Sequence, residues 1–374
     1  MDFATSSHAA RWLFSAEQLF EIRESTNASS AAASACGQSK KSRTGEEGGE
    51  GDAAPDSAPS TSAPEGGGVS AGDERRLLRF YDGEIVKLCV RLGYPAKVKA
   101  TALMYCKRFF LHHSCITHNP ARLMLTCIYL AGKIEEAYIG AEDFCRMLNQ
   151  DIKAVLNNEV LLLQGLQFDL IVHSPYRALG GLIEDLKSCV EEGPSSGADE
   201  PLLSASPEVL SRWKAKAESS TDALMMGDAP LLHPPAQLAL AALRSALRAD
   251  GVKLPGYMRR VVRRSRGGGG GGSGAAGAAA GSAGEDDDLS RLMAALDDID
   301  RLGMEGAQKV DVSEVQAIDK RLKAYRAPAD PEAARAAASA AEKDKAERRE
   351  AKLKARREQA AAAEARLLGM PQQP

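Results

Sequence analysis

Apolar residues between positions 73 and 263 recur at the three- and four-residue intervals of amphipathic helices, and no segment alternates strictly as a half-buried strand would. Short polar, glycine, proline or asparagine breaks divide the first part of this region into helices. The predicted helices are residues 73–92, 96–112, 120–136, 141–148 and 153–167. Five helices in succession predict one all-α domain, which we place at residues 73–171.

A second block, residues 172–263, repeats part of the first. The pattern His-x-Pro-Ala-x-Leu-x-Leu begins at His118 in the first block and at His233 in the second. In both, proline falls at the first position of a helix, where its missing N–H costs nothing, and an apolar run follows. We therefore predict two tandem five-helix repeats. Coincidence is the alternative, and the period is too long for a solenoid.

The N-terminal segment, residues 1–25, contains a helix start in the stretch FSAEQLFEIRE. Ser15 and Gln18 have the spacing of a capping box, which predicts a helix over residues 16–24. A helix this short is unstable alone in water, so its apolar side chains should dock on the chain's own domain or on a partner. These side chains are Trp12, Phe14, Leu19 and Phe20.

Four further segments differ in composition. Residues 26–72 are Ala, Ser, Gly, Pro and Glu with almost no large apolar residue, which predicts a disordered linker. Residues 264–284 form a Gly-rich linker. Residues 285–328 begin with acids and carry leucines at helical spacing, which predicts a C-terminal docking helix region. Residues 329–374 are charged and Ala-rich without an apolar stripe, so they are predicted to be a solvated helix or disordered.

Charge and cysteine content narrow the class of protein. The net charge of −3 gives no global attraction to nucleic acid or to an anionic membrane. The longest apolar run, residues 123–132, is too short to cross a bilayer, and the N-terminus lacks the apolar core of a secretory signal. Seven cysteines without a C-x-x-C pair favour reduced, buried thiols over disulfides or zinc. We expect a cytoplasmic or nuclear protein.

The sequence offers no persuasive catalytic site. It contains no glycine-rich phosphate loop before a helix, no His-Glu-x-x-His motif, no nucleophile elbow and no kinase or hydrolase signature. The histidines stand near predicted helix ends, where a capping or surface role is the ordinary one. We therefore expect no enzymatic activity, no metal and no cofactor.

The third predicted helix ends in an unusual way. It is apolar on nearly all sides, so it should be the central helix of the first block. Lys133 on its last turn is favourable near the carbonyl end of the helix dipole, whereas Glu135 and Glu136 each cost about 0.3–1 kcal/mol there. The helix dipole therefore does not explain why two acids stand at this end of the helix. With Ile134 and Tyr138 beside them, the charges suggest a partner-binding patch.

Three stretches, LMLTCIYLAGKIEEAY, NEVLLLQGLQFDLIVHSPYR and ATALMYCKRFFL, together resemble the cyclin box. The resemblance covers residues 11–24 and 73–262, with a looser match over 289–328. It implies two five-helix repeats and a regulatory subunit that activates a cyclin-dependent kinase. Gly132 stands where the family usually has Cys or Ser, and the first helix shows no substrate-docking patch of the kind found in cell-cycle cyclins.

The resemblance also implies a binding site for the kinase. In the family, a lysine that ends the third helix bonds to backbone carbonyls beside the mobile regulatory helix of the kinase. A glutamate of the fifth helix orients this lysine and contacts the kinase too. Here the two residues are Lys133 and Glu159. The positions implied to complete the contact are Ile134, Glu136, Leu163 and Leu170.

The resemblance is to the transcriptional cyclins, which implies three partners and a nuclear location. These partners are a cyclin-dependent kinase of the activating type, an assembly-factor subunit of the same complex, and the core of the transcription factor TFIIH. The implied roles are cell-cycle control and RNA polymerase II transcription. One alternative is a transcriptional cyclin that binds a kinase other than the activating one.

A second alternative is a DNA-binding protein of the TFIIB type, which is built on the same duplicated fold. Five arginines between positions 259 and 266 could neutralise phosphates, or they could serve as a nuclear import signal. We favour the import signal and expect no direct contact with nucleic acid.

Overall fold

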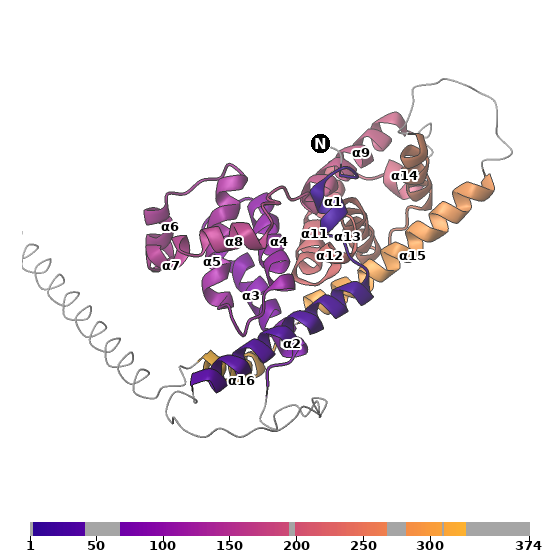
Figure 1. Cartoon of the computed structure of the whole chain (residues 1–374). Helices are drawn as coiled ribbons and strands as arrows, with labels where there is room; N and C mark the ends of the chain where they lie inside the picture. Colours follow the sequence, from indigo (N-terminus) through magenta and orange to yellow (C-terminus); the bar gives the residue numbers. More distant parts are fainter. Residues whose placement is uncertain (1–2, 42–67, 194–198, 268–281, 309, 327–374) are drawn as a thin grey trace, which may run out of the picture. The chain divides into compact units, whose positions relative to one another are not determined.

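The computed structural model describes residues 3–41, 68–193, 199–267, 282–308 and 310–326, and among these residues it contains helices and no strand (Figure 1). The all-α prediction is confirmed. One compact unit comprises Met1–Ala32 and Ser62–Leu322, and all the contacts below lie within it. A second unit comprises Ala33–Thr61 and Lys323–Pro374. The predicted tail, residues 329–374, and most of both predicted linkers lie outside the described residues.

The first block folds around one apolar helix. Its elements are α3 (Ala71–Arg91), α4 (Ala96–His112), α5 (Pro120–Ile134), α6 (Ala141–Leu148), α7 (Ile152–Leu156) and α8 (Glu159–Gly165). As its sequence predicts, α5 is the central helix and packs against α3, α4, α7 and α8. Proline opens it and the Asn119 side chain caps it by accepting a bond from the Ala121 amide, 3.0 Å long.

Several boundaries in this block differ from the prediction, and two of the differences have a clear cause. The single helix predicted over residues 153–167 is divided into α7 and α8 at Asn157 and Asn158. Asparagine side chains compete for backbone hydrogen bonds and favour such breaks. The central helix also ends at Ile134 and not at residue 136, because Glu136 adopts a left-handed conformation with φ of 56°.

The second block repeats this plan. Its elements are α9 (Pro175–Glu192), α10 (Glu200–Leu203), α11 (Pro207–Met226), α12 (Ala229–Leu232), α13 (Pro235–Ala249) and α14 (Pro255–Gly267). Helix α13 has the same length as α5, begins with the matching proline, and packs against α9 and α11. Helix α14 runs past residue 263, where the second repeat was predicted to end.

The C-terminal region forms α15 (Ser282–Ala307) and α16 (Val312–Arg326). The start of α15 lies inside the predicted Gly-rich linker of residues 264–284, so that boundary was wrong. Leu296 and Ile299 of α15 are fully buried in the core of the second block. Packing against α11, α13 and α14 therefore holds α15 on the second block.

The N-terminal segment docks on the junction between the blocks. It forms α1 (Ser7–Arg11), which was not predicted, and α2 (Ala16–Lys41). Trp12 is only 1% exposed, and its Nε1 donates to Asp169 Oδ2 at 2.9 Å. The buried Arg108 guanidinium lies 5.0 Å from the Trp12 ring and donates to the Asp169 carbonyl at 2.9 Å. Three elements distant in sequence thus meet at Asp169.

Helix α2 confirms one prediction and contradicts two. The Ser15 and Gln18 capping box forms, with bonds of 2.9 and 3.2 Å. The helix does not stop at residue 24, and its continuation to Lys41 replaces part of the predicted linker. Alanine-rich turns favour helix, and Asn27 docks by donating to Glu74 at 2.7 Å. Phe20, predicted to dock, is 65% exposed.

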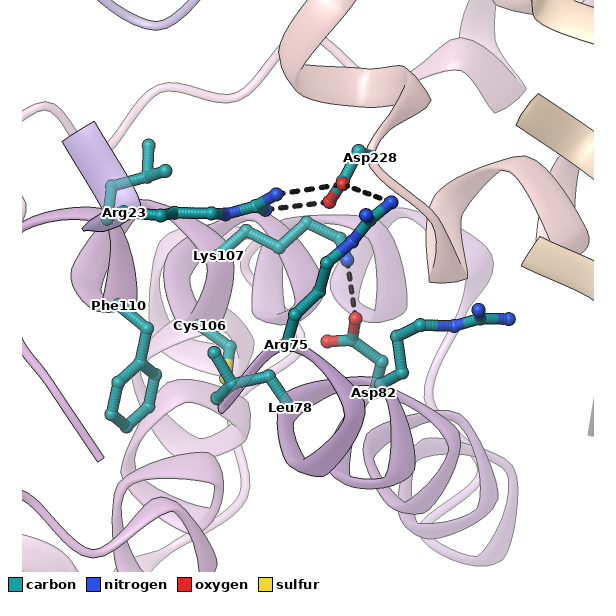
Figure 2. A pocket seen from close by; sticks show the side chains of 10 residues that line it. Arg23, Arg75, Leu78, Asp82, Cys106, Lys107, Phe110 and Asp228 are labelled. Carbon is teal, nitrogen blue, oxygen red and sulfur yellow. Dashed lines mark hydrogen bonds and ion pairs between the residues drawn. The ribbon is translucent and has the colours of Figure 1, made fainter. Parts of the chain in front are cut away.

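Charged side chains join α2, α3 and α4 to the start of α12 (Figure 2). Asp228 accepts two bonds from Arg23, at 2.7 and 2.8 Å, and pairs with Arg75 at 2.9 Å. Burial acts to raise the pKa of Asp228, but the bonds from Arg23 prevail and hold it well below its ordinary value. Nearby, the buried Asp82 pairs with Lys107; burial raises the pKa of Asp82 to about 6, and Lys107 limits the rise.

Replacing Trp12 with alanine should lower the free energy of unfolding by about 3 kcal/mol or more, because the change empties a buried site and removes a bond to Asp169. Urea unfolding followed by far-UV circular dichroism measures the loss. Phe20→Ala is the matched control and should change stability by less than about 0.5 kcal/mol, since its ring is exposed. Equal effects of the two changes would contradict the docking of Trp12.

Acid should weaken the docking of the N-terminal segment through His8. Burial, with Arg108 and His173 nearby, lowers the pKa of His8 from 6.5 to about 3. Between these values the unfolded state binds a proton that the folded state does not, so stability falls as pH falls, by up to about 1.4 kcal/mol per pH unit.

The comparison for this effect is His8→Asn, which keeps an acceptor for the His173 amide that bonds to His8 Nδ1 at 3.2 Å. Urea unfolding of both proteins between pH 7 and pH 5 should show the wild-type protein losing stability relative to the variant. A constant difference across this range would contradict the role of His8.

Candidate partner-binding site

The structure brings Lys133 and Glu159 together at the surface of the first block. Lys133 lies in the last turn of α5, and Glu159 is the first residue of α8. The ammonium of Lys133 donates to Glu159 Oε1 in an ion pair and lies 5.0 Å from the centre of the Tyr129 ring. The side chains are 32% and 20% exposed, so a partner can reach both. Each charge also lies at the favourable end of its helix dipole.

Two glycines allow the helices that carry this pair to approach their neighbours closely. A Cβ added at Gly132 would lie 2.7 Å from the Tyr94 hydroxyl, which accounts for glycine at the position before Lys133. A Cβ added at Gly165 would lie 2.5 Å from a ring carbon of Phe109 on α4. A Cβ closer than 3.0 Å would force the neighbouring side chain to shift, so both glycines permit the close approach seen here.

The two acids that follow α5 have different environments. Glu135 accepts a bond from the Thr101 hydroxyl at 2.6 Å and lies 3.9 Å from Lys97, so its place is explained by packing on α4. Glu136 is exposed and forms no ion pair with the part of the chain that the structure describes. Of the two, Glu136 is therefore the one available to a partner.

Apolar side chains are exposed along the end of α5, along α8 and in the segment that follows α8. Ile134 was predicted from the sequence, whereas Val160, Phe168 and Ile171 were missed. Phe168 is 66% exposed and, like Gln167 before it, has a positive φ, which L-residues rarely adopt. Such backbone strain is common at functional sites, although sequence alone did not reveal it here. The predicted Leu163 and Leu170 are half-buried.

The predicted N-terminal docking residues contact the two blocks of this same chain. Trp12 and Leu19 are buried, and Phe14 is half-buried with its amide donating to the Leu231 carbonyl at 2.9 Å. These side chains join the N-terminal segment to the two blocks, so a partner would meet them only after they had undocked.

The basic cluster of α14 is largely engaged by acids of the fold. Arg260 pairs with Glu192 through bonds of 2.9 and 3.2 Å, Arg263 bonds to Glu285 at 2.7 Å, and Arg264 pairs with Asp185. These pairs fasten α14 to α9 and α15, so three of the arginines that could have bound phosphate are already neutralised. The observation weighs against the DNA-binding alternative.

The described residues show no sign of metal binding or of a membrane-spanning segment. They contain no group of three or more His, Cys, Asp or Glu side chains placed to hold a metal ion. Six cysteines in these ranges are free and buried, and burial raises the pKa of Cys89 to about 12. No helix within them is long and apolar enough to span a membrane.

Comparisons with known proteins agree with this architecture. Residues 70–171 match the family described as "Cyclin, N-terminal domain". A curated relative, Cyclin-H1-1 of Arabidopsis thaliana, is 36% identical over 267 residues, which are 67% of this chain and 72% of the relative.

Two solved structures share the fold. A chain of the CAK complex of Chaetomium thermophilum bound to ATP-gamma-S has a TM-score of 0.65 at 24% identity, and the match covers 87% of this chain and 89% of that one. A chain of the yeast TFIIK (Kin28/Ccl1/Tfb3) complex has a TM-score of 0.52 at 19% identity, with coverage of 80% and 100%. Because of the sequence match over most of the length of its relative, the chain belongs to the cyclin family and, within it, to the cyclin H group.

Proposed function

We propose that this chain is the regulatory cyclin subunit of a CDK-activating kinase and that it acts in cell-cycle control and RNA polymerase II transcription as part of TFIIH. The observation that carries the proposal is the half-exposed ion pair of Lys133 and Glu159 among exposed apolar side chains. Its relatives in the cyclin H group support the choice of kinase.

The chemistry of the pair suits recognition of a partner's main chain. An ammonium has three donors, of which Glu159 takes one, and the remaining donors can bond to carbonyl oxygens. The carboxylate of Glu159 likewise retains acceptor capacity for a partner N–H. The apolar neighbours Ile134, Leu163 and Leu170 would bury surface around these polar contacts.

Activation follows from a shift of population in the kinase. Kinase catalysis requires its Lys–Glu ion pair to be closed and its activation loop to be in place. A cyclin that binds only this closed form stabilises it by the difference in affinity for the two forms. The cyclin itself needs no catalytic group for this role, and we assign it none.

The proposed partners follow from the cyclin H group. The CAK complex and the three-subunit TFIIK complex, each with a chain of this fold, support a kinase of the activating type and an assembly-factor subunit. The TFIIH core is the third proposed partner, and the nucleus is the proposed location. Within residues 259–266, Arg259 is exposed and forms no ion pair with the described part of the chain, so it is the arginine that supports a candidate import signal.

Replacing Lys133 or Glu159 with alanine should weaken association with the activating kinase by about 2–4 kcal/mol, because each change leaves a polar group of the contact without its partner. Isothermal titration calorimetry with the purified kinase measures the affinity, and a kinase assay at limiting cyclin measures activation. The far-UV circular dichroism spectrum should not change.

The matched control is Lys87→Ala, which removes a lysine from an exposed pair with Glu84 on the same block. It should leave affinity within about twofold, as for most surface ion pairs. Full activation by the Lys133 and Glu159 variants would refute the assigned site. Purification with a different kinase would favour the other transcriptional cyclins, and DNA binding that weakens steeply with salt would favour the TFIIB-type alternative.

A further inference from the structure

The duplication of the fold places a second cationic helix end in the second block. Arg248 is the residue before the last of α13, as Lys133 is of α5, and the two helices have the same length. Arg244 lies one turn earlier, at the position that Tyr129 holds on α5. The place corresponding to the candidate kinase site is therefore basic on both of these turns.

A groove with a volume of about 360 Å³ opens beside these two arginines. It lies between the end of α13, the α13–α14 connection, α14 and α15. Its apolar lining includes Leu247, Val252, Leu254, Met258, Leu289 and Met293. Such a lining favours an occupant that buries apolar side chains.

The charges around the groove do not balance. Arg244 is buried and pairs with Asp297 at 2.9 Å and Asp300 at 2.6 Å, and Arg248 shares both acids. These two cations and two anions offset each other.

Two more cations line the same groove. Lys253 and Arg259 are exposed and form no ion pair with any residue in the described ranges. An excess of positive charge therefore lies beside the apolar lining, which a negatively charged partner would complement.

We propose that this groove binds an acidic amphipathic helix of a partner protein. Its apolar side chains, at i, i+3, i+4 and i+7 spacing, would contact the lining, and its carboxylates would pair with Lys253 and Arg259. A nucleic acid backbone would satisfy the two cations but would leave the apolar lining exposed to water, so a protein helix is the better occupant. The site is separate from the Lys133 and Glu159 pair and does not depend on which kinase is bound.

The test uses the full chain and a fluorescein-labelled, hydrocarbon-stapled helical peptide of about 18 residues, with leucines at i, i+3, i+4 and i+7 and glutamates beside them. Fluorescence anisotropy should give a micromolar Kd that weakens as salt is added. The double variant Lys253→Glu and Arg259→Glu should raise the Kd at least tenfold. Leu289→Ser with Met293→Ser should raise it as well, because the lining is also required.

Two controls make the result specific. The double variant Lys187→Glu and Lys214→Glu changes net charge equally at exposed lysines elsewhere on the second block, and should leave the Kd within twofold. A peptide with lysine in place of each glutamate should not bind. The proposal is overturned if neither peptide binds, if both bind alike, or if the groove variants leave the Kd unchanged. It is also overturned if inositol hexakisphosphate alone binds through the cations with no effect of the lining variants.

Discussion

The fully buried guanidinium of Arg108 organises the junction on which the rest of the molecule is built. It donates to the Asp169 carbonyl and lies against the Trp12 ring, while the Asp169 carboxylate accepts from Trp12 and pairs with Arg11. Burial lowers the pKa of Arg108 to about 10, yet the side chain stays charged at neutral pH. A buried charge is tolerated only with close partners, so removing one would be strongly destabilising. The N-terminal segment, α4 and the connection between the blocks all contact this one side chain or its partner Asp169.

This junction also positions the candidate site. The connection that Arg108 holds begins directly after Phe168, which is exposed and is the second of two successive left-handed residues. The Tyr105 hydroxyl donates to the Leu170 carbonyl at 2.6 Å from the same helix, α4. The backbone strain near Phe168 is therefore sustained by hydrogen bonds from a rigid, buried element.

The two blocks use the same architecture for different purposes. In the first, the lysine at the end of the central helix pairs with a glutamate of the same block and remains half-exposed. In the second, the corresponding Arg248 pairs with Asp297 and Asp300 of α15, a helix added after the block. The C-terminal helix thus satisfies charges that, in the first block, are proposed to meet another protein.

Sequence patterns predicted the elements whose stability is local. The bounds of α4 and α6, the capping box of Ser15 and Gln18, and the central position of α5 all followed from periodicity and capping. The length of α2 and the start of α15 did not, because α2 beyond residue 24 and α15 contact distant parts of the chain. Asn27, for example, docks through polar bonds that a search for apolar stripes does not detect.

The pairing of Lys133 with Glu159 was expected from the family resemblance, but the exposed Phe168 and Val160 were not. An apolar side chain in a helical pattern is usually buried, and only the tertiary fold decides which of several equivalent faces meets solvent. The excess positive charge beside the α13–α14 groove could not be predicted for a similar reason. The sequence does not tell which arginines form ion pairs with acids of distant helices.

The contact of Gly165 with the Phe109 ring has a mechanical consequence for α8. The Phe109 ring limits how near the C-terminal end of this short helix lies to α4. A methyl group at position 165 would push α8 away from α4 and would displace Glu159 at the other end of this helix. The absence of a side chain at Gly165 therefore helps to set where the Glu159 carboxylate lies on the partner-binding surface.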